Sequence, residues 1–263
     1  IQPETADTVT IGAVFTPAFA PGLSVTIDYF NVKVNQAITN ATPADVINAC
    51  FGSITAQSAS SAACTSIRRS QVNGRLSGSV NAPAFTFGLP TPLTNLGRIA
   101  TSGIDLSAAY SVDVGFAKLS FNLNGTYTIE NKFRASPASI NRECVGQYSV
   151  NCGIVGGGIQ PEWVHNFRTG LDFGSANVSV LWNYIGGVEY ERILPRVFAG
   201  TITGSGPLVG QQVDFNRIKA FSYFDLAGGF KIMDNISIDM LVSNLFDKKP
   251  PNVGSTVGTT GQN

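Results

Sequence analysis

The chain has 263 residues, and its 17 basic side chains balance its 17 acidic ones, so no net charge directs it toward nucleic acid. Charged residues make up only 13% of the sequence, whereas 43% are hydrophobic and 10% aromatic, which excludes a disordered chain. The apolar runs are far shorter than the ~20 residues that a membrane helix needs, so a helical membrane protein is also excluded. We therefore expect an all-β structure in which apolar residues alternate with small polar ones.

Alternation of apolar and polar residues predicts about eight strands. In the clearest case Leu119, Phe121 and Leu123 alternate with serine and asparagine. Several predicted strands reach the ~10 residues that a tilted strand needs to cross a bilayer. In chain order the predicted strands are Val9–Phe15, Leu23–Val34, Ile104–Asp113, Lys118–Ile129, Trp163–Phe173, Asn177–Ile185, Ala220–Ile232 and Ile236–Ser243.

The connections between these strands are of two kinds. Four short turns are predicted, at Pro17–Gly22, Val114–Ala117, Gly174–Ser175 and Met233–Asn235. Much longer segments, near residues 35–97, 131–161 and 190–218, lie between the resulting hairpins. Short turns alternating with long loops are typical of an antiparallel transmembrane β-barrel with periplasmic turns and extracellular loops. No stretch has a helical amphipathic pattern that we would assign as a helix.

The four cysteines fall into two close pairs, Cys50 with Cys64 and Cys144 with Cys152. Both pairs lie in polar, loop-like stretches. A zinc site is disfavoured, because neither histidine nor a CxxC spacing accompanies them. Local structural disulfides in an oxidising compartment fit better, although four cysteines also allow other pairings.

The aromatic residues near the strand ends predict the girdles of a membrane barrel, with a sugar-stacking platform as the alternative. His165, the only histidine, has the same parity as Trp163 and Phe167, so we interpret it as a membrane-interface residue, with ligand contact as the alternative. The girdle candidates are Trp163, Trp182, Tyr184, Tyr110, Tyr127 and Tyr190.

The charged residues indicate no catalytic site, so we do not expect an enzyme. The strand carboxylates have no spacing that argues for acid–base chemistry, and most are expected to point into a wet lumen. Arg68, Arg69 and Arg75 form a small basic cluster in the first long segment, interpreted as a solvated loop, with contact to an anionic ligand or lipopolysaccharide as the alternative. No metal site or cofactor is predicted. The strand carboxylates are Asp28, Asp105, Asp113, Asp172, Asp225 and Asp239.

Several stretches resemble the C-terminal barrel of TonB-dependent outer-membrane receptors. Asn95–Tyr110 (NLGRIATSGIDLSAAY) is similar to a frequent strand of that family, and Asn244–Pro251 (NLFDKKPP) matches the element before its last strand. Leu23–Ile38 and the hairpin Pro161–Val188 resemble further family segments. The cysteine pairs also stand where many such receptors carry loop disulfides. The Asn244 and Asp247 side chains are expected to hydrogen-bond their own backbone in a turn.

The resemblance implies energy-coupled uptake of a nutrient such as a siderophore, cobalamin or glycan, in the outer membrane of a Gram-negative bacterium. Residues 1–263 would then be a partial barrel domain, lacking the plug domain, the earlier strands and the last strand. The implied partners are outer-membrane lipid and lipopolysaccharide, the remainder of the receptor, the TonB complex through the plug, and a small-molecule or glycan ligand, but no nucleic acid. The ligand binding residues are unknown from the sequence.

A second hypothesis from another class stays open at this point. The chain could be a complete small outer-membrane barrel, or a secreted β-sandwich, that acts as an adhesin or binding module. Small polar residues, rather than Lys and Glu, dominate the second parity of the strands, which favours a lumen over a water-exposed outer face.

Overall fold

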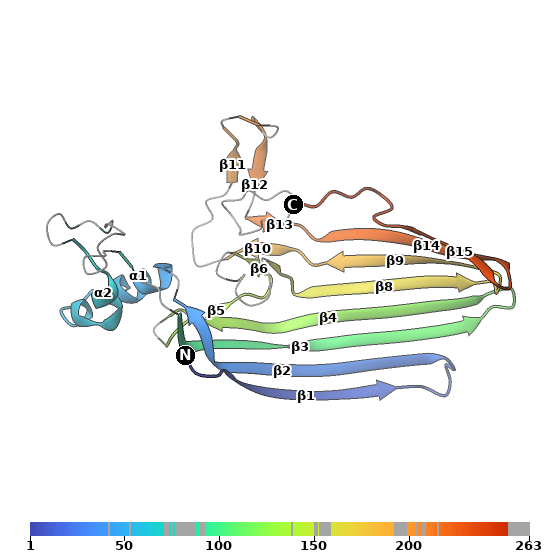
Figure 1. Cartoon of the computed structure of the whole chain (residues 1–263), viewed down its shortest axis with the longest axis horizontal. Coiled ribbons are helices and arrows are strands. Elements are labelled where there is room, and N and C mark those ends of the chain that lie inside the picture. The colour runs from blue at the N-terminus through green and yellow to red at the C-terminus, as the bar shows by residue number, and fades with distance from the viewer. Residues whose placement is uncertain are drawn as a thin grey trace. The chain divides into compact units, whose positions relative to one another are not determined.

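The computed structural model describes residues 1–41, 43–52, 54–70, 74, 76, 88–89, 93–137, 139–149, 152, 159–191, 199–203, 205–206, 209–214 and 216–251. Within them, eight long antiparallel strands are hydrogen-bonded side by side in the order β1-β2-β3-β4-β8-β9-β14-β15 (Figure 1). This main sheet confirms the all-β fold class and the eight predicted strands. Their bounds are β1 Thr5–Phe15, β2 Leu23–Asn40, β3 Leu93–Asp113, β4 Lys118–Arg134, β8 Trp163–Asp172, β9 Ala176–Ile185, β14 Phe221–Met233 and β15 Ile236–Val242.

Short turns close the four hairpins of the main sheet, as predicted. The turns after β3 and β8 use the same local device, in which an aspartate at the strand end accepts a hydrogen bond from the amide of a glycine two residues on. The distance is 2.7 Å both for Gly115 N to Asp113 Oδ1 and for Gly174 N to Asp172 Oδ1. Because such a bond satisfies the backbone inside the turn, each hairpin can reverse within a few residues.

Antiparallel pairing places the two parities of the strands on opposite faces of the main sheet. Leu119 pairs with Leu171 and Leu123 with Phe167, while Asn124 pairs with Asn166. Directly opposed residues share a face, so the apolar parity forms one continuous face and the polar parity the other. Many large side chains of the apolar face are exposed, including Val9, Ile11, Ile129, Val178, Val180, Phe230, Ile238 and Met240.

Four strands are clearly longer than the alternation predicts, and the first, β1, begins at Thr5 rather than at Val9. The strand β3 has 21 residues and begins at Leu93, eleven positions before the predicted start. The strands β2 and β4 also continue beyond their predicted ends, to Asn40 and Arg134. In these extensions the sequence no longer alternates. The strands continue nevertheless, because the ladder of backbone hydrogen bonds does not depend on the side-chain pattern.

The chain divides into two compact units, and the first consists of Ile1–Asp7, Lys33–Ala100 and Lys132–Glu143. It contains the helices α1 (Pro43–Phe51) and α2 (Ala62–Ser66), the single turn η1 (Ser58–Ser60) and the short strand β5 (Arg142–Glu143), which pairs with β4. The expectation that this segment holds no helix is wrong. Helices of nine and five residues are too short for a helical period to emerge, and tertiary contacts stabilise them instead. Among the described residues, no helix has the length and hydropathy required to cross a bilayer.

The second unit consists of Thr8–Val32, Thr101–Asn131 and Cys144–Asn263. Besides most of the main sheet it contains a small sheet in the order β13-β10-β6-β7, which the sequence did not reveal. Tyr148 and Val188 form its buried core. The strands β6 and β10 pair in parallel, and the other two pairs are antiparallel. The bounds are β6 Gln147–Tyr148, β7 Ile159–Gln160, β10 Val188–Tyr190 and β13 Arg217–Ile218; a separate hairpin joins β11 Ala199–Thr201 to β12 Gln212–Asp214.

The apolar face yields a first prediction, at Gly125. A Cβ atom there would lie 2.5 Å from Cη2 of Trp163, so Gly125→Ala must displace the indole ring. Overpacking of this kind costs about 1–3 kcal/mol, and we expect a lower unfolding temperature with a shifted tryptophan emission. The control is Gly228→Ala on the same face, where the nearest atom is 3.3 Å away. Equal unfolding temperatures for the two variants would contradict the prediction.

Candidate functional site

The polar face of the main sheet is the candidate functional surface, because it gathers the carboxylates, amides and hydroxyls of the strands. The registers place Asn122 opposite Arg168, and Asn183 opposite both Asn166 and Tyr223. The carboxylates of Asp172, Asp225 and Asp239 lie on this face as well, since they pair with Lys118, Leu181 and Gly229. The strand pairing therefore places these three aspartates on the polar face, as their parity predicts, and their direction into a lumen stays a prediction.

Hydrogen bonds between neighbouring strands hold the polar side chains in place. Thr126 Oγ1 donates to Asp105 Oδ1 at 2.6 Å, and Ser107 Oγ donates to Asn124 Oδ1 at 2.9 Å, so β3 and β4 are joined through side chains. Arg168 Nη1 donates to Ser179 Oγ at 3.0 Å between β8 and β9. Bonds of this kind fix the side chains and leave their other lone pairs and protons available to a bound solute.

A concave region of about 570 Å³ lies on this polar face. Its lining includes Asp28 and Asp105, with amides and hydroxyls from β4, β8, β9 and β14. A volume of this size is typical of small-molecule sites. Among the described residues, no group of three or more His, Cys, Asp or Glu side chains is placed to hold a metal ion. Because its lining is rich in amides and hydroxyls, this surface can hydrogen-bond a polar solute along its length.

His165 lies on the opposite, apolar face, in agreement with its predicted parity. Its ring stacks on Tyr184 with centroids 5.1 Å apart and meets the Trp182 ring edge-on at 4.5 Å. The indole Nε1 of Trp163 donates to His165 Nδ1 at 2.8 Å, which satisfies that ring nitrogen. The histidine is thus part of an aromatic cluster, although it also contributes to the lining of the concave region that contains Asp28 and Asp105.

Aromatic rings continue across the apolar face in rows. Tyr110 stacks on Phe121, and Phe121 on Phe167, with centroid separations of 6.4 and 6.2 Å. Trp182 stacks on Phe224 in the next pair of strands, at 6.1 Å. Such rows are the expected form of a girdle. One predicted member is wrong, because Tyr190 packs against Tyr148 in the small sheet rather than on this face.

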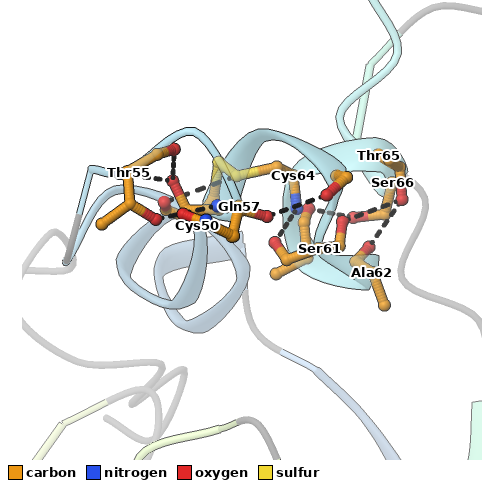
Figure 2. The surroundings of a disulfide bond; sticks show 11 residues. Cys50, Thr55, Gln57, Ser61, Ala62, Cys64, Thr65 and Ser66 are labelled. Carbon is orange, nitrogen blue, oxygen red and sulfur yellow. Dashed lines mark hydrogen bonds between the residues drawn. A yellow bond between two sulfur atoms is a disulfide. The ribbon is translucent and has the colours of Figure 1, made fainter.

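Both cysteine pairs form disulfides, with the local pairing that the sequence favours. The Cys50–Cys64 bond joins α1 to α2, and Figure 2 shows it beside the hydrogen bonds that shape the intervening loop. Ser61 caps α2, since its Oγ accepts from Cys64 N at 3.3 Å. The second bond, Cys144–Cys152, closes a shorter loop. Closing a loop of about 15 residues stabilises a fold by roughly 3 kcal/mol, mainly by restricting the unfolded chain.

The structure also shows an interaction that sequence reasoning missed. Arg142 Nη1 lies 2.7 Å from Oδ1 and 3.0 Å from Oδ2 of Asp45, and both side chains are at most 2% exposed. The two residues are 97 positions apart. No local sequence pattern marks such a pair. The one typical feature is the position of Asp45 in the first turn of α1, where a negative charge interacts favourably with the helix dipole.

The predicted basic cluster is only partly visible. Arg69 Nη1 donates to the carbonyl oxygen of Gly74 at 3.1 Å, and the backbone of Arg68 pairs with Gly88. Arg75 lies outside the described residues. The contact to Gly74 is local to its loop, which is consistent with the interpretation as a loop cluster.

Comparison with known proteins identifies the family. The family model described as TonB dependent receptor-like, beta-barrel matches residues 1–245. The chain belongs to the TonB-dependent receptor β-barrel family. Homologues of this family are outer-membrane β-barrel receptors and transporters of Gram-negative bacteria, not enzymes. A search of curated proteins finds no match.

Solved TonB-dependent receptors share the fold at low identity. The siderophore receptor PirA from Acinetobacter baumannii is 15% identical, with a TM-score of 0.52 over 98% of this chain and 30% of that protein. The FrpB iron transporter from Neisseria meningitidis is 14% identical, with a TM-score of 0.50 over 93% of this chain and 27% of that protein. The copper transporter OprC is 15% identical, with a TM-score of 0.50 over 94% of this chain and 26% of that protein. The chain thus spans less than a third of the length of each.

Two elements that resemble the TonB-dependent receptor family have clear structural reasons. A Cβ at Gly103 would meet the carbonyl oxygen of Tyr127 at 2.6 Å, so this position admits only glycine. In the NLFD turn, Asn244 Oδ1 accepts from Lys248 N at 2.9 Å and Asn244 Nδ2 donates to Lys248 O at 3.1 Å. Asn244 and Asp247 both have positive φ, at 51° and 46°. Asparagine and aspartate tolerate this conformation better than other side chains, which explains the motif.

The NLFD turn of this TonB-dependent receptor chain gives a prediction at Asp225. Its Oδ1 accepts from Asn244 N at 2.7 Å and its Oδ2 from Asn183 Nδ2 at 3.2 Å. A hydrogen bond to a charged group is worth about 1.5–3 kcal/mol, so Asp225→Ala should accelerate amide exchange across the turn. The control is Asp239→Ala, which removes another carboxylate from the same face. Unchanged exchange in Asp225→Ala would contradict the anchoring role.

The small sheet gives a prediction about pH. Burial raises the pKa of Tyr148 to about 12, with smaller contributions from Tyr190 and Asp214. The unfolded phenol loses its proton near pH 10, so the folded sheet holds this proton more tightly. Stability is therefore retained below pH 10 and should fall between pH 10 and 12, as measured by tyrosinate absorbance and amide exchange. Tyr148→Phe should remove the Tyr148 part of this loss; an identical pH profile in the variant would contradict the assignment.

Proposed function

We propose that this chain forms part of an outer-membrane receptor that takes up a small nutrient in a TonB-dependent manner. The observation that carries the proposal is the family match over residues 1–245, together with a sheet whose exposed face is apolar and whose other face is polar. A large exposed apolar surface is unfavourable in water but stable against lipid. Cytoplasm-facing or secreted soluble proteins do not normally present such a face.

Residues 1–263 are proposed to be a partial barrel domain, with the plug domain and the remaining strands supplied by the rest of the receptor. The support comes from the structural matches. They cover 98% and 94% of this chain but only 30% of PirA and 26% of OprC. In lipid, every backbone group needs a partner, so β1 and β15, which pair on one side only among the described strands, require further strands. Coupling to the TonB complex would then operate through the plug.

The proposed orientation has the short turns in the periplasm and the long segments outside the cell. Each short turn joins two strands that are neighbours in the main sheet, and each long segment connects one of these hairpins to the next. This arrangement is the rule for outer-membrane barrels. The aromatic rows on the apolar face would contact lipid and lipopolysaccharide.

The proposed substrate is a small solute of the siderophore or metal-complex class. The supporting observations are the solved proteins of similar fold, which are a siderophore receptor, an iron transporter and a copper transporter. Cobalamin and glycans are further substrates within the proposal. The polar face supplies many neutral hydrogen-bonding groups, which suit a hydrated solute passing along it.

The test is an immunoblot of purified outer membranes, with an antibody raised against residues 35–97. We expect a band severalfold heavier than a 263-residue chain, and nutrient uptake that stops when the proton gradient is collapsed or TonB is deleted. The matched control is a porin substrate, whose entry should be unaffected. A band at the mass of a 263-residue chain would instead favour a small barrel or an adhesin. Uptake that does not depend on TonB would refute the coupling.

A further inference from the structure

A second concave site lies within the first unit. It has a volume of about 480 Å³ and is lined by the helices α1 and α2, the start of β3 and the turn that follows β4. Small-molecule sites typically have volumes of about 300–1,000 Å³. Alkyl groups form its walls, with alanines at positions 41, 49, 62 and 63, and Val46, Leu96 and Pro137 between them.

Three long-range links fix the walls of this alanine pocket relative to each other. The Cys50–Cys64 disulfide joins α1 to α2. The buried Asp45–Arg142 ion pair joins α1 to β5, and Thr39 Oγ1 donates to the carbonyl oxygen of Ala135 at 2.8 Å. The turn itself is closed by the bond from Ser139 N to Ser136 O, at 2.9 Å. A pocket held in this way is formed before a ligand arrives, which reduces the entropy lost on binding.

The charge of the lining indicates which ligand fits. Among the described residues that line the alanine pocket, Asp45 is the charged one, and Arg142 neutralises it. An anion would meet this carboxylate and no cation of the described lining, while a cation would compete with an ion pair that is expensive to break once buried. Hydroxyls of Ser66, Thr94 and Ser139 at the lining can accept a hydrogen bond. The chemistry therefore suits an uncharged, mostly apolar group that carries a donor.

We infer that the alanine pocket binds an uncharged, mostly apolar part of a small ligand, such as a hydroxylated ring. The inference rests on the proposed receptor function and deepens it, since it names a chemical class for one part of the ligand. Charged parts of the same ligand would lie outside this pocket. The described lining of this pocket shares no residue with that of the concave region on the polar face.

The test uses the intact receptor in detergent and ligand-observed fluorine NMR. The probe is 4-fluorobenzyl alcohol, and the matched anion is 4-fluorobenzoate, which has the same ring. We expect saturable line broadening for the alcohol and none above empty micelles for the benzoate. Ala63→Phe fills the pocket and should weaken binding of the alcohol at least roughly tenfold, as expected when a ligand group is excluded from its pocket.

The control variant is Ala59→Phe, which adds the same ring at an exposed position of η1 outside the lining. It should bind the alcohol like the unmodified receptor. Ala49→Leu, on α1, fills the pocket independently and decides the question if Ala63→Phe disturbs the disulfide-linked helices. Equal binding in all variants would overturn the inference, and so would broadening of the benzoate that Ala63→Phe abolishes.

The two proposals can fail separately. If the unmodified receptor shows no saturable binding of the alcohol while TonB-dependent uptake is present, the alanine pocket is rejected and the receptor function stands. TonB-independent behaviour would reject the proposed function, whatever the fluorine probe shows.

Discussion

Backbone hydrogen bonding between antiparallel strands is the constraint on which the rest of this structure depends. It fixes the register, and the register decides that Leu123 shares a face with Phe167 while Asn124 shares the other with Asn166. Because side chains alternate with a period of two, a slip of one residue would turn every apolar group toward the polar side. The apolar outer face, the polar wall and the exposed aromatic rows all follow from this single pairing.

The same constraint explains why the connecting segments differ so much in character. Turns such as Asp113–Gly115 only need to reverse the chain, and one carboxylate-to-amide bond is enough to shape them. The long segments must build their own cores, and they use covalent and ionic links to do so. The first has a disulfide and a buried Asp45–Arg142 pair, and the second unit has a small sheet packed around Tyr148. Even a connecting segment of this length is small compared with a domain and buries little apolar surface, so such links replace a larger core.

The proposed receptor function would place different demands on these parts. A wall of neutral amides and hydroxyls, with carboxylates such as Asp105 and Asp225 already engaged by neighbours, would bind a passing solute weakly at many points. Recognition needs a site with fixed walls, and the alanine pocket has them. A division between a permissive wall and a preformed pocket would let one receptor admit a hydrated solute and still discriminate among ligands.

The sequence by itself determined the eight main strands, their short turns and the two faces, because each depends on neighbours a few residues apart. It favoured the local cysteine pairs without excluding other pairings, and it determined that His165 shares a face with Trp163 and Phe167 and that a turn is built on Asn244. Only the tertiary structure decided the helices α1 and α2, the small sheet, the placement of Tyr190 and the ion pair of Asp45 with Arg142. These features depend on groups brought together from distant positions, 97 residues apart in the case of the ion pair, and such contacts leave no periodic trace in the chain.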